Sequence, residues 1–194
     1  MDPVPEPFAS LVRDHRMVEE VVSGARRSIA AATAAGANDQ VVTAAIEQIR
    51  DLDAFAAVDL ALHIAKEEQV LFPAVRARAE GEMVTILTDM IAQHDAIRDS
   101  NAELRFMLKT LDAGHDALRA ELTTLASGIE AAASAPSPAQ LASLSTTVRT
   151  LDAILQGHFV DEEVNVFEMV AGWFSLESLA EFSARMSALA ADFS

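Results

Sequence analysis

Four long segments of the chain repeat apolar residues at helical spacing, and a histidine interrupts the apolar stripe of each one. Two segments carry a lone histidine, and two carry a histidine followed four residues later by a glutamate. Residues four apart lie on one face of a helix, about 6 Å apart along its axis. The interrupting residues are His15, His63, Glu67, His94, His158 and Glu162. If the four segments pack together, these side chains face one shared core.

The first two helices can be placed from the same periodicity. The first is expected from about Pro7 or Ser10 to Ala35, and a glycine follows it directly. Asn38 or Asp39 is a suitable N-terminal cap for the second. In that second helix the histidine and glutamate take positions that a core stripe would otherwise give to apolar residues.

The middle of the chain is less regular. Pro73 is expected to kink the second helix, which ends near residues 78–81. The third helix starts around Glu82, and Gly114 suggests a break before a further helical stretch over residues 118–133. The sequence leaves open whether this region is one helix or two.

The end of the chain contains a fourth long helix and a short one. Residues 135–138 read Ala-Pro-Ser-Pro and predict a linker before the fourth helix. A last amphipathic helix is expected over about residues 175–190. We expect it to cap the bundle, or to meet a second subunit or another protein partner.

The spacing between turns and histidines predicts the fold. The turns lie about 20 to 27 residues from the histidines, which is about 30 to 40 Å of helix, so antiparallel neighbours return them to one level. We therefore predict an all-α, antiparallel up-down four-helix bundle with an additional C-terminal helix. Residues 1–194 are expected to form a single domain, with the core bundle over about residues 8–170.

Composition narrows the class of function. The net charge of −16 repels phosphate backbones, which argues against a nucleic-acid partner. The chain has no cysteine, so thiolate-bound zinc and iron–sulfur clusters are excluded. No run approaches the roughly 18 apolar residues of a membrane span, and the N-terminus lacks the pattern of a secretory signal. We expect a cytoplasmic protein without a membrane contact.

The histidines and glutamates predict a metal centre. A single histidine on an apolar stripe is usually a buried, hydrogen-bonded residue. Four at compatible depths, two with a carboxylate one turn later, are different, because burying them without a cation would cost several kcal/mol. The predicted metal ligands are His15, His63, Glu67, His94, His158 and Glu162.

Other residues near these positions have weaker claims. Glu19 follows His15 by one turn and is read first as a carboxylate at the helix edge, second as a ligand or a partner of one. Asp59 precedes His63 by one turn and either orients its imidazole or is exposed. The remaining residues are assigned as follows: Glu68 and Glu163 as solvated, His115 as too far along the helix to be a ligand, and Met90, Phe72, Phe159 and Phe167 as core packing that keeps water away.

Imidazole and carboxylate without sulfur suit iron, manganese or zinc. Two glutamates on opposing helices can bridge two metals roughly 3.5 to 4 Å apart, with two histidines on each ion. Six protein side chains leave six-coordinate iron short of ligands. Dioxygen, peroxide or nitric oxide are therefore natural small ligands for such a pair.

These residues resemble a known family. His15, the run His63-Ile-Ala-Lys-Glu67-Glu-Gln-Val-Leu-Phe-Pro73, His94 and His158-Phe-Val-Asp-Glu162-Glu look like the hemerythrin-like domains that bind cations through His-His-Glu motifs. The resemblance covers about residues 8–170. It implies two iron ions in an oxo- or hydroxo-bridged centre, with Glu67 and Glu162 bridging, and zinc or manganese as alternatives.

One departure bears on function. Oxygen-carrying hemerythrins have a second histidine one turn after that of the third helix, and Arg98 stands there in this chain. The pattern therefore resembles the H–HxxxE–H–HxxxE subgroup, and reversible oxygen carriage is disfavoured. The chain has no tyrosine, which excludes a phenolate ligand. A ferritin-like bundle would place glutamate first, as Glu-x-x-His, and none of these histidines has that spacing.

Three functions stay open at this point. The first is a non-haem diiron protein that binds or senses dioxygen, peroxide or nitric oxide. The second is a diiron oxidoreductase that decomposes peroxide or reduces nitric oxide. The third is a structural metal-binding module whose last helix contacts a partner protein. The sequence does not settle whether the protein is an enzyme.

Overall fold

The computed structural model describes residues 5–34, 36–125 and 136–193, with side chains described in these ranges except at 114–125 and 192. Within this part of the chain the secondary structure is helical, and no strand is present. The helical segments are α1 (Phe8–Thr33), α2 (Asp39–Phe55), η1 (Ala56–Leu60), α3 (Ala61–Lys66), η2 (Glu67–Leu71), α4 (Phe72–Arg76), α5 (Glu82–Leu125), α6 (Pro138–Val160), η3 (Asp161–Phe167), α7 (Glu168–Val170), η4 (Ala171–Trp173) and α8 (Leu176–Asp192).

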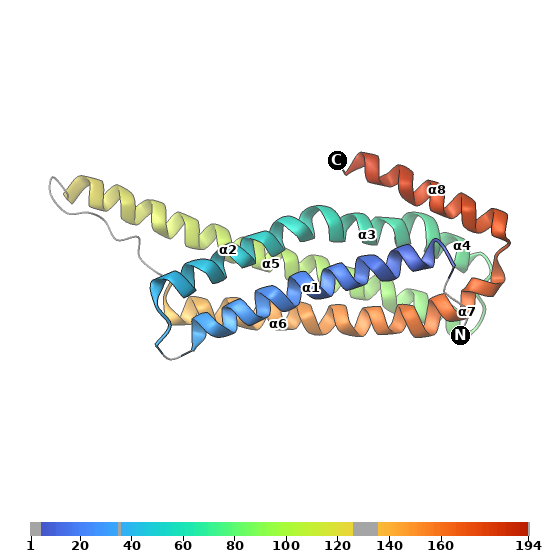
Figure 1. Ribbon diagram of the computed structural model, residues 1–194, viewed down its shortest axis with the longest axis horizontal. Helices are drawn as coiled ribbons and strands as arrows, with labels where there is room; N and C mark the ends of the chain where they lie inside the picture. The colour runs from blue at the N-terminus through green and yellow to red at the C-terminus, as the bar shows by residue number, and fades with distance from the viewer. Residues whose placement is uncertain (1–4, 35, 126–135, 194) are drawn as a thin grey trace.

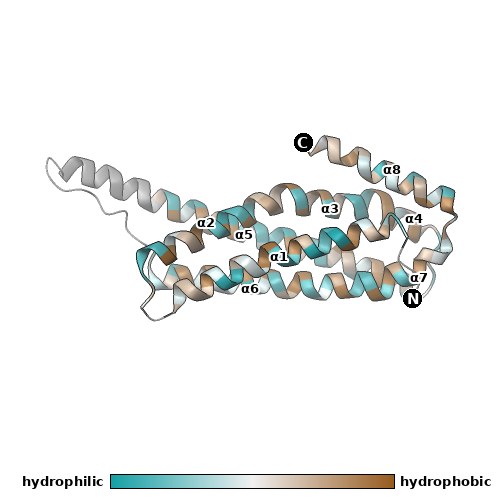
Figure 2. Ribbon diagram, viewed as in Figure 1, coloured by the Kyte–Doolittle hydropathy of each residue, from teal (hydrophilic) through white to brown (hydrophobic). Residues whose placement is uncertain are grey.

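The long helices form the predicted antiparallel bundle with an additional C-terminal helix (Figure 1). The run from α2 to α4 is one unbroken rod, and α6 continues through η3 into α7. Helix α1 packs against α2 and α6, and α5 packs against α6. Hydrophilic and hydrophobic residues are interspersed along each rod (Figure 2), and many of the hydrophobic ones are buried between the rods.

The turn between α1 and α2 follows the predicted chemistry. Gly36 has a φ of 85°, in the left-handed region that favours glycine. The Asn38 side chain accepts a hydrogen bond from the backbone N–H of Val41 at 3.0 Å, which confirms it as the cap of α2. A short turn of this kind makes the two helices antiparallel neighbours.

Apolar packing divides into two cores along the bundle axis. The first core holds mostly aliphatic side chains of α1, α2, α5 and α6, with Ile29, Ile49 and Leu151 among those fully buried. The second core lies toward α4, α7 and α8 and is richer in aromatic rings, including Phe8 and Phe167. The polar residues predicted to bind metal lie between the two.

Two π-helical turns coincide with the predicted glutamate ligands. η2 starts at Glu67, and η3 contains Glu162 as its second residue. π-helical turns are rare in proteins overall, and those that occur are often found at functional sites. Pro73 lies just after η2 and cannot donate to the carbonyl of Gln69, four residues earlier. The guanidinium of Arg185, on α8, donates to that carbonyl at 3.1 Å.

The sequence left open whether the region after Glu82 is one helix or two, and the structure shows no break at Gly114. Helix α5 runs without interruption from Glu82 to Leu125, so the region is one long helix as far as the structure describes it. A glycine inside a helix costs only about 1 kcal/mol, which is too little to end a long helix by itself. The helical stretch predicted over residues 126–133 lies outside the described residues.

The last helix packs on the bundle itself, which is the first of the alternatives expected for it. Helix α8 contacts α3 and η2, and its buried face holds Leu179, Phe182 and Met186. It therefore covers the rod that carries one His-x3-Glu pair. Among the described residues, no helix combines the length and apolar character that crossing a bilayer requires.

Candidate metal centre

The six predicted ligands converge in the middle of the bundle, and each is at most 1% exposed. We call them the six-residue cluster: His15 from α1, His63 from α3, Glu67 from η2, His94 from α5, His158 from α6 and Glu162 from η3. Among the described residues, their donor atoms form two sets of four, each with all atoms within 4.8 Å of one another. One set holds His15 and His63, the other holds His94 and His158, and both glutamates belong to both sets.

Each glutamate of the cluster lies between histidines from different rods. The Glu67 carboxylate is 2.9 Å from Nε2 of His63 on its own rod and 3.1 Å from Nε2 of His94 on α5. The Glu162 carboxylate is 3.0 Å from Nε2 of His15 on α1 and 3.6 Å from Nε2 of His158. Both carboxylates are thus placed to bridge the two sets.

The donor atoms fit a cation better than they fit one another. Both oxygens of Glu67 and of Glu162, together with Nε2 of His15, are buried without a partner in hydrogen-bond geometry. Nε2 of His94 lies 3.0 Å from Nε2 of His158, a contact between two imidazole nitrogens that needs a proton or a cation between them. Buried polar atoms normally have hydrogen-bond partners, so a group of buried donor atoms without partners fits a bound cation.

Glu68 and Glu163 correct the prediction that these residues are solvated. Glu68 accepts a hydrogen bond from Nδ1 of His94, and Glu163 accepts one from Nδ1 of His15, both at 2.9 Å. Each glutamate follows a cluster glutamate directly, so it points into the seam between two rods instead of into bulk water. Because an ionised carboxylate only accepts, it holds the ring proton on Nδ1 and leaves Nε2 for a cation.

An arginine holds each of these outer glutamates. Arg98 donates to Glu68 and Arg16 donates to Glu163, each at 2.7 Å. Arg98 is the residue that stands where oxygen carriers have another histidine, and it serves the outer contact. Glu19 contacts Arg16 at 3.1 Å and is not among the groups around the cluster, so it lies at the helix edge as first expected.

The outer partner of His63 is Asp14, which the sequence reading missed. The Asp14 carboxylate lies 3.5 Å from Nδ1 of His63 and accepts a hydrogen bond from Lys66 at 2.7 Å. Burial acts to raise the pKa of Asp14, but His63 and Lys66 together hold it below its usual value. Asp59, the candidate proposed for this role, is exposed.

The outer partner of His158 is an amide. Nδ1 of His158 is 2.9 Å from the Gln93 side-chain oxygen, which accepts its proton. The Gln93 amide in turn donates to Asp161 at 3.1 Å, and Asp161 also accepts from Asn165 at 3.3 Å. Every cluster imidazole therefore has an outer polar contact at Nδ1.

Within the cluster, burial and neighbouring charges shift the pKa values of the side chains in opposite directions. Burial alone would lower the pKa of His63, but the adjacent Glu67 carboxylate raises it to about 10. Burial acts to raise the pKa of Glu67, yet contacts with His63 and His94 hold it well below 4.5. Burial and the charge of Glu67 raise the pKa of Glu162 to about 8, and burial lowers that of His158 to about 3. A bound cation would replace protons on these side chains.

Aromatic rings close the space around the cluster. The His15 ring stacks on Phe159 with centroids 4.1 Å apart, and the His94 ring stacks on Phe72 at 5.6 Å. Phe167 and Met90 are also buried, which agrees with the prediction that these side chains pack the core. The cluster is thus walled from bulk water by apolar groups.

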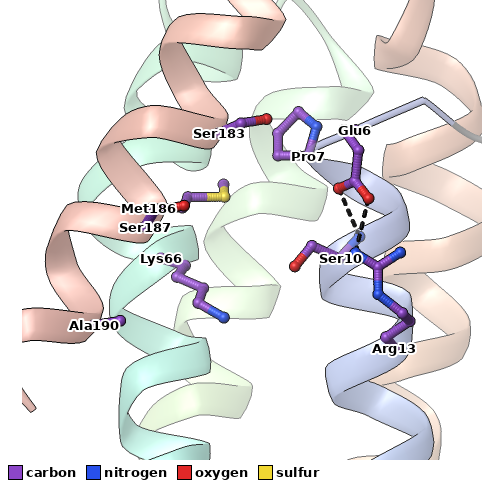
Figure 3. A pocket seen from close by; sticks show the side chains of 9 residues that line it. All are labelled: Glu6, Pro7, Ser10, Arg13, Lys66, Ser183, Met186, Ser187 and Ala190. Carbon is purple, nitrogen blue, oxygen red and sulfur yellow. Dashed lines mark hydrogen bonds and ion pairs between the residues drawn. The ribbon is translucent and has the colours of Figure 1, made fainter. Parts of the chain in front are cut away.

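Two surface cavities lie beside the outer partners of the cluster. Figure 3 looks into a cavity of about 440 Å³ between α8, α3 and α1, where Lys66 points from α3 toward α1. A second cavity of about 240 Å³ is lined by Glu68, Arg98 and Asn101. Neither is lined by a member of the six-residue cluster. A molecule in these cavities would meet the outer contacts first.

Two sequence signals could have found the outer partners. A second glutamate follows each His-x3-Glu pair, and a polar residue, Asp14 or Gln93, directly precedes each lone histidine. To interpret either signal one must know which rods are neighbours, and the spacing of residues along one helix does not contain that information. The side chain of His115 lies outside the described residues, so its exclusion as a ligand stays a prediction.

Comparison with known families identifies the kind of domain. Residues 6–113, more than half of the chain, match the model of the hemerythrin HHE cation binding domain. Searches of curated proteins and of solved structures gave no match. The match includes the first four residues of the cluster, and the last two lie beyond it, where the structure places them beside the others. The chain therefore belongs to the hemerythrin HHE cation-binding domain family.

Proposed function

We propose that this chain is a non-haem diiron protein that binds or senses dioxygen, peroxide or nitric oxide. The six-residue cluster would hold the two ions, with the glutamates shared between them and a pair of histidines on each. The observation that carries this is the two sets of buried donor atoms, each set with its atoms within 4.8 Å of one another. The carboxylate oxygens of both glutamates, and Nε2 of His15 and of His63, lack a hydrogen-bond partner. Nitrogen and oxygen donors of this kind suit iron, and zinc and manganese also fit.

The burial of the cluster supports a small ligand. Its members are at most 1% exposed, and two cavities near them are lined by outer residues, one by Lys66 and the other by Glu68 and Arg98. A bulky organic substrate would have to displace buried rings such as Phe72 and Phe159. Diatomic molecules and peroxide need no such displacement.

The protein's own groups have distinct roles in this proposal. Iron held here would supply one-electron chemistry and open coordination positions. Glu68 and Glu163 keep the protons of His94 and His15 on Nδ1, so that Nε2 faces the ions. The stacked phenylalanines exclude water, which strengthens electrostatic interactions within the site. No member of the set is placed as a general acid beside an open substrate pocket, which favours binding or sensing over turnover.

The test starts from protein loaded anaerobically with ferrous iron. Metal analysis should give two ions per chain, and exposure to air should produce the visible absorption of a coupled ferric pair. Nitric oxide added to the ferrous form should change its spectrum. Binding of no metal, or of one ion only, would contradict the proposal.

A peroxide assay separates binding from catalysis. Hydrogen peroxide is added to the iron-loaded protein while oxygen release is followed. Spectral change without sustained oxygen release is the expected result. Continuous release would replace the binding or sensing function with a peroxide-decomposing enzyme.

A further inference from the structure

The two halves of the cluster repeat one another in sequence position. Asp14 directly precedes His15, and Gln93 directly precedes His94. The Asp14 carboxylate lies 3.5 Å from Nδ1 of the paired histidine His63, and the Gln93 oxygen lies 2.9 Å from Nδ1 of the paired histidine His158. The two outer residues are therefore equivalent in place, but one is a carboxylate and the other a neutral amide.

The next residues outward differ in charge as well. Lys66 lies three residues after His63 and donates to Asp14 at 2.7 Å. Asp161 lies three residues after His158 and accepts from Gln93 at 3.1 Å. One half is thus backed by a lysine–aspartate pair, and the other by an aspartate behind an amide.

We propose that Asp14 and Gln93 make the two cation positions unequal, so that the position of His15 and His63 takes up the first cation and holds it more tightly. This inference rests on the proposed function. Both residues act through a histidine and are positioning residues. In the half with His15, both imidazoles face a carboxylate at Nδ1, namely Glu163 and Asp14. In the half with His94, only one imidazole does.

The chemical reason is the basicity of the ligand. A carboxylate at Nδ1 draws the ring proton outward and makes Nε2 a stronger donor to a metal. An amide oxygen carries only a partial charge, so the effect is smaller. Losing an outer partner of this kind typically costs a ligand set about 10- to 100-fold in metal affinity.

Other charges near the two positions work against this difference without reversing it. Lys66 offsets part of the Asp14 charge, and Asp161 adds negative charge behind Gln93. Asp161, however, is linked to His158 through the Gln93 amide, whereas the Asp14 carboxylate itself lies 3.5 Å from Nδ1 of His63. Arg16 and Arg98 hold Glu163 and Glu68 alike and do not distinguish the halves. The direct carboxylate contact therefore decides the order.

Isosteric substitutions separate the two positions. Ferrous iron is added stepwise to the metal-free full chain under anaerobic conditions. Calorimetry follows the two binding steps, and Mössbauer spectra with ⁵⁷Fe are recorded at one and two equivalents. Wild type should show two steps about tenfold or more apart and one iron species at one equivalent. Asp14→Asn should weaken the first step by about tenfold and leave the second nearly unchanged.

The opposite change should make the halves alike. Gln93→Glu combined with Asp161→Lys places a carboxylate–lysine pair behind His158, as Asp14 and Lys66 provide behind His63. The second step should then tighten by about tenfold, and the two steps should merge. Asp59→Asn is the matched control, since it removes an exposed carboxylate one turn from His63. Both steps should be unchanged in it.

The outcomes distinguish this inference from the function on which it rests. Two equal steps in wild type, or Asp14→Asn weakening the second step and leaving the first as it was, would overturn the unequal positions while two ions still bind. Failure of wild type to bind two ions would overturn the proposed function instead. Circular dichroism and the melting temperature of each metal-free variant identify any loss of folding, and Gln93→Glu alone replaces the double variant if that variant unfolds.

Discussion

The six-residue cluster and the first core occupy neighbouring levels of the same helices, and they differ in how their side chains are satisfied. In the first core, Ile49 and Leu151 are fully buried among other apolar groups. About four turns beyond Ile49 and two turns beyond Leu151, the same inward stripes carry His63 and His158, at the level where buried nitrogens and oxygens lack hydrogen-bond partners. The first core stabilises the bundle, and the bundle in turn holds the six-residue cluster in place.

The largest expected effect comes from removing a cluster residue. His63→Ala or Glu162→Ala should lower the number of bound ions from two to at most one, because a set that loses a donor keeps only three protein ligands. Metal analysis after anaerobic loading measures this, with Asp59→Asn as the control. Retention of two ions in either variant would show that the cluster is not the binding site.

A substitution in the first core should have the opposite effect, lowering stability without changing the number of bound ions. Ile49→Ala removes buried methyl groups from the first core and should lower the free energy of unfolding by about 2 to 5 kcal/mol. The number of bound ions should stay at two, because Ile49 belongs to the packing and not to the cluster. Urea unfolding and metal analysis on the same samples make the comparison. A change in stoichiometry would mean that the two levels are not separable.

A smaller effect is expected at an outer contact. Glu68→Gln keeps the size of the side chain but replaces the carboxylate that faces Nδ1 of His94. Metal affinity should fall by about tenfold, or about 1.4 kcal/mol, with both ions still bound at saturation. Calorimetric titration measures the loss. Affinity equal to wild type would return Glu68 to the solvated role first expected of it.

The smallest effect is expected at the fifth histidine. His115→Ala should leave metal content and affinity unchanged, since residue 115 lies 21 positions beyond His94 on one continuous helix, about 30 Å away. Metal analysis of this variant beside wild type is sufficient. Loss of an ion would contradict the register of α5.

Sequence reasoning found the cluster because its signal is local. Histidine at a core position of a helix, with glutamate one turn later, is visible in one segment at a time, and the bundle brought all six residues together. The partners at Nδ1 were missed because they lie across seams between rods, as Glu68 does with His94. Whether a helix breaks at Gly114 could not be decided from the sequence, because a glycine inside a helix costs only about 1 kcal/mol, which tertiary context can override.

The bond from Arg185 to the Gln69 carbonyl gives the C-terminal helix a part in the wide turn that begins at Glu67. Proline leaves one backbone oxygen there without its usual donor, and a residue 116 positions later supplies one. Truncation before α8 would remove this donor from the turn that carries Glu67. The backbone there would lose a hydrogen bond although every histidine and glutamate of the cluster remained in the sequence.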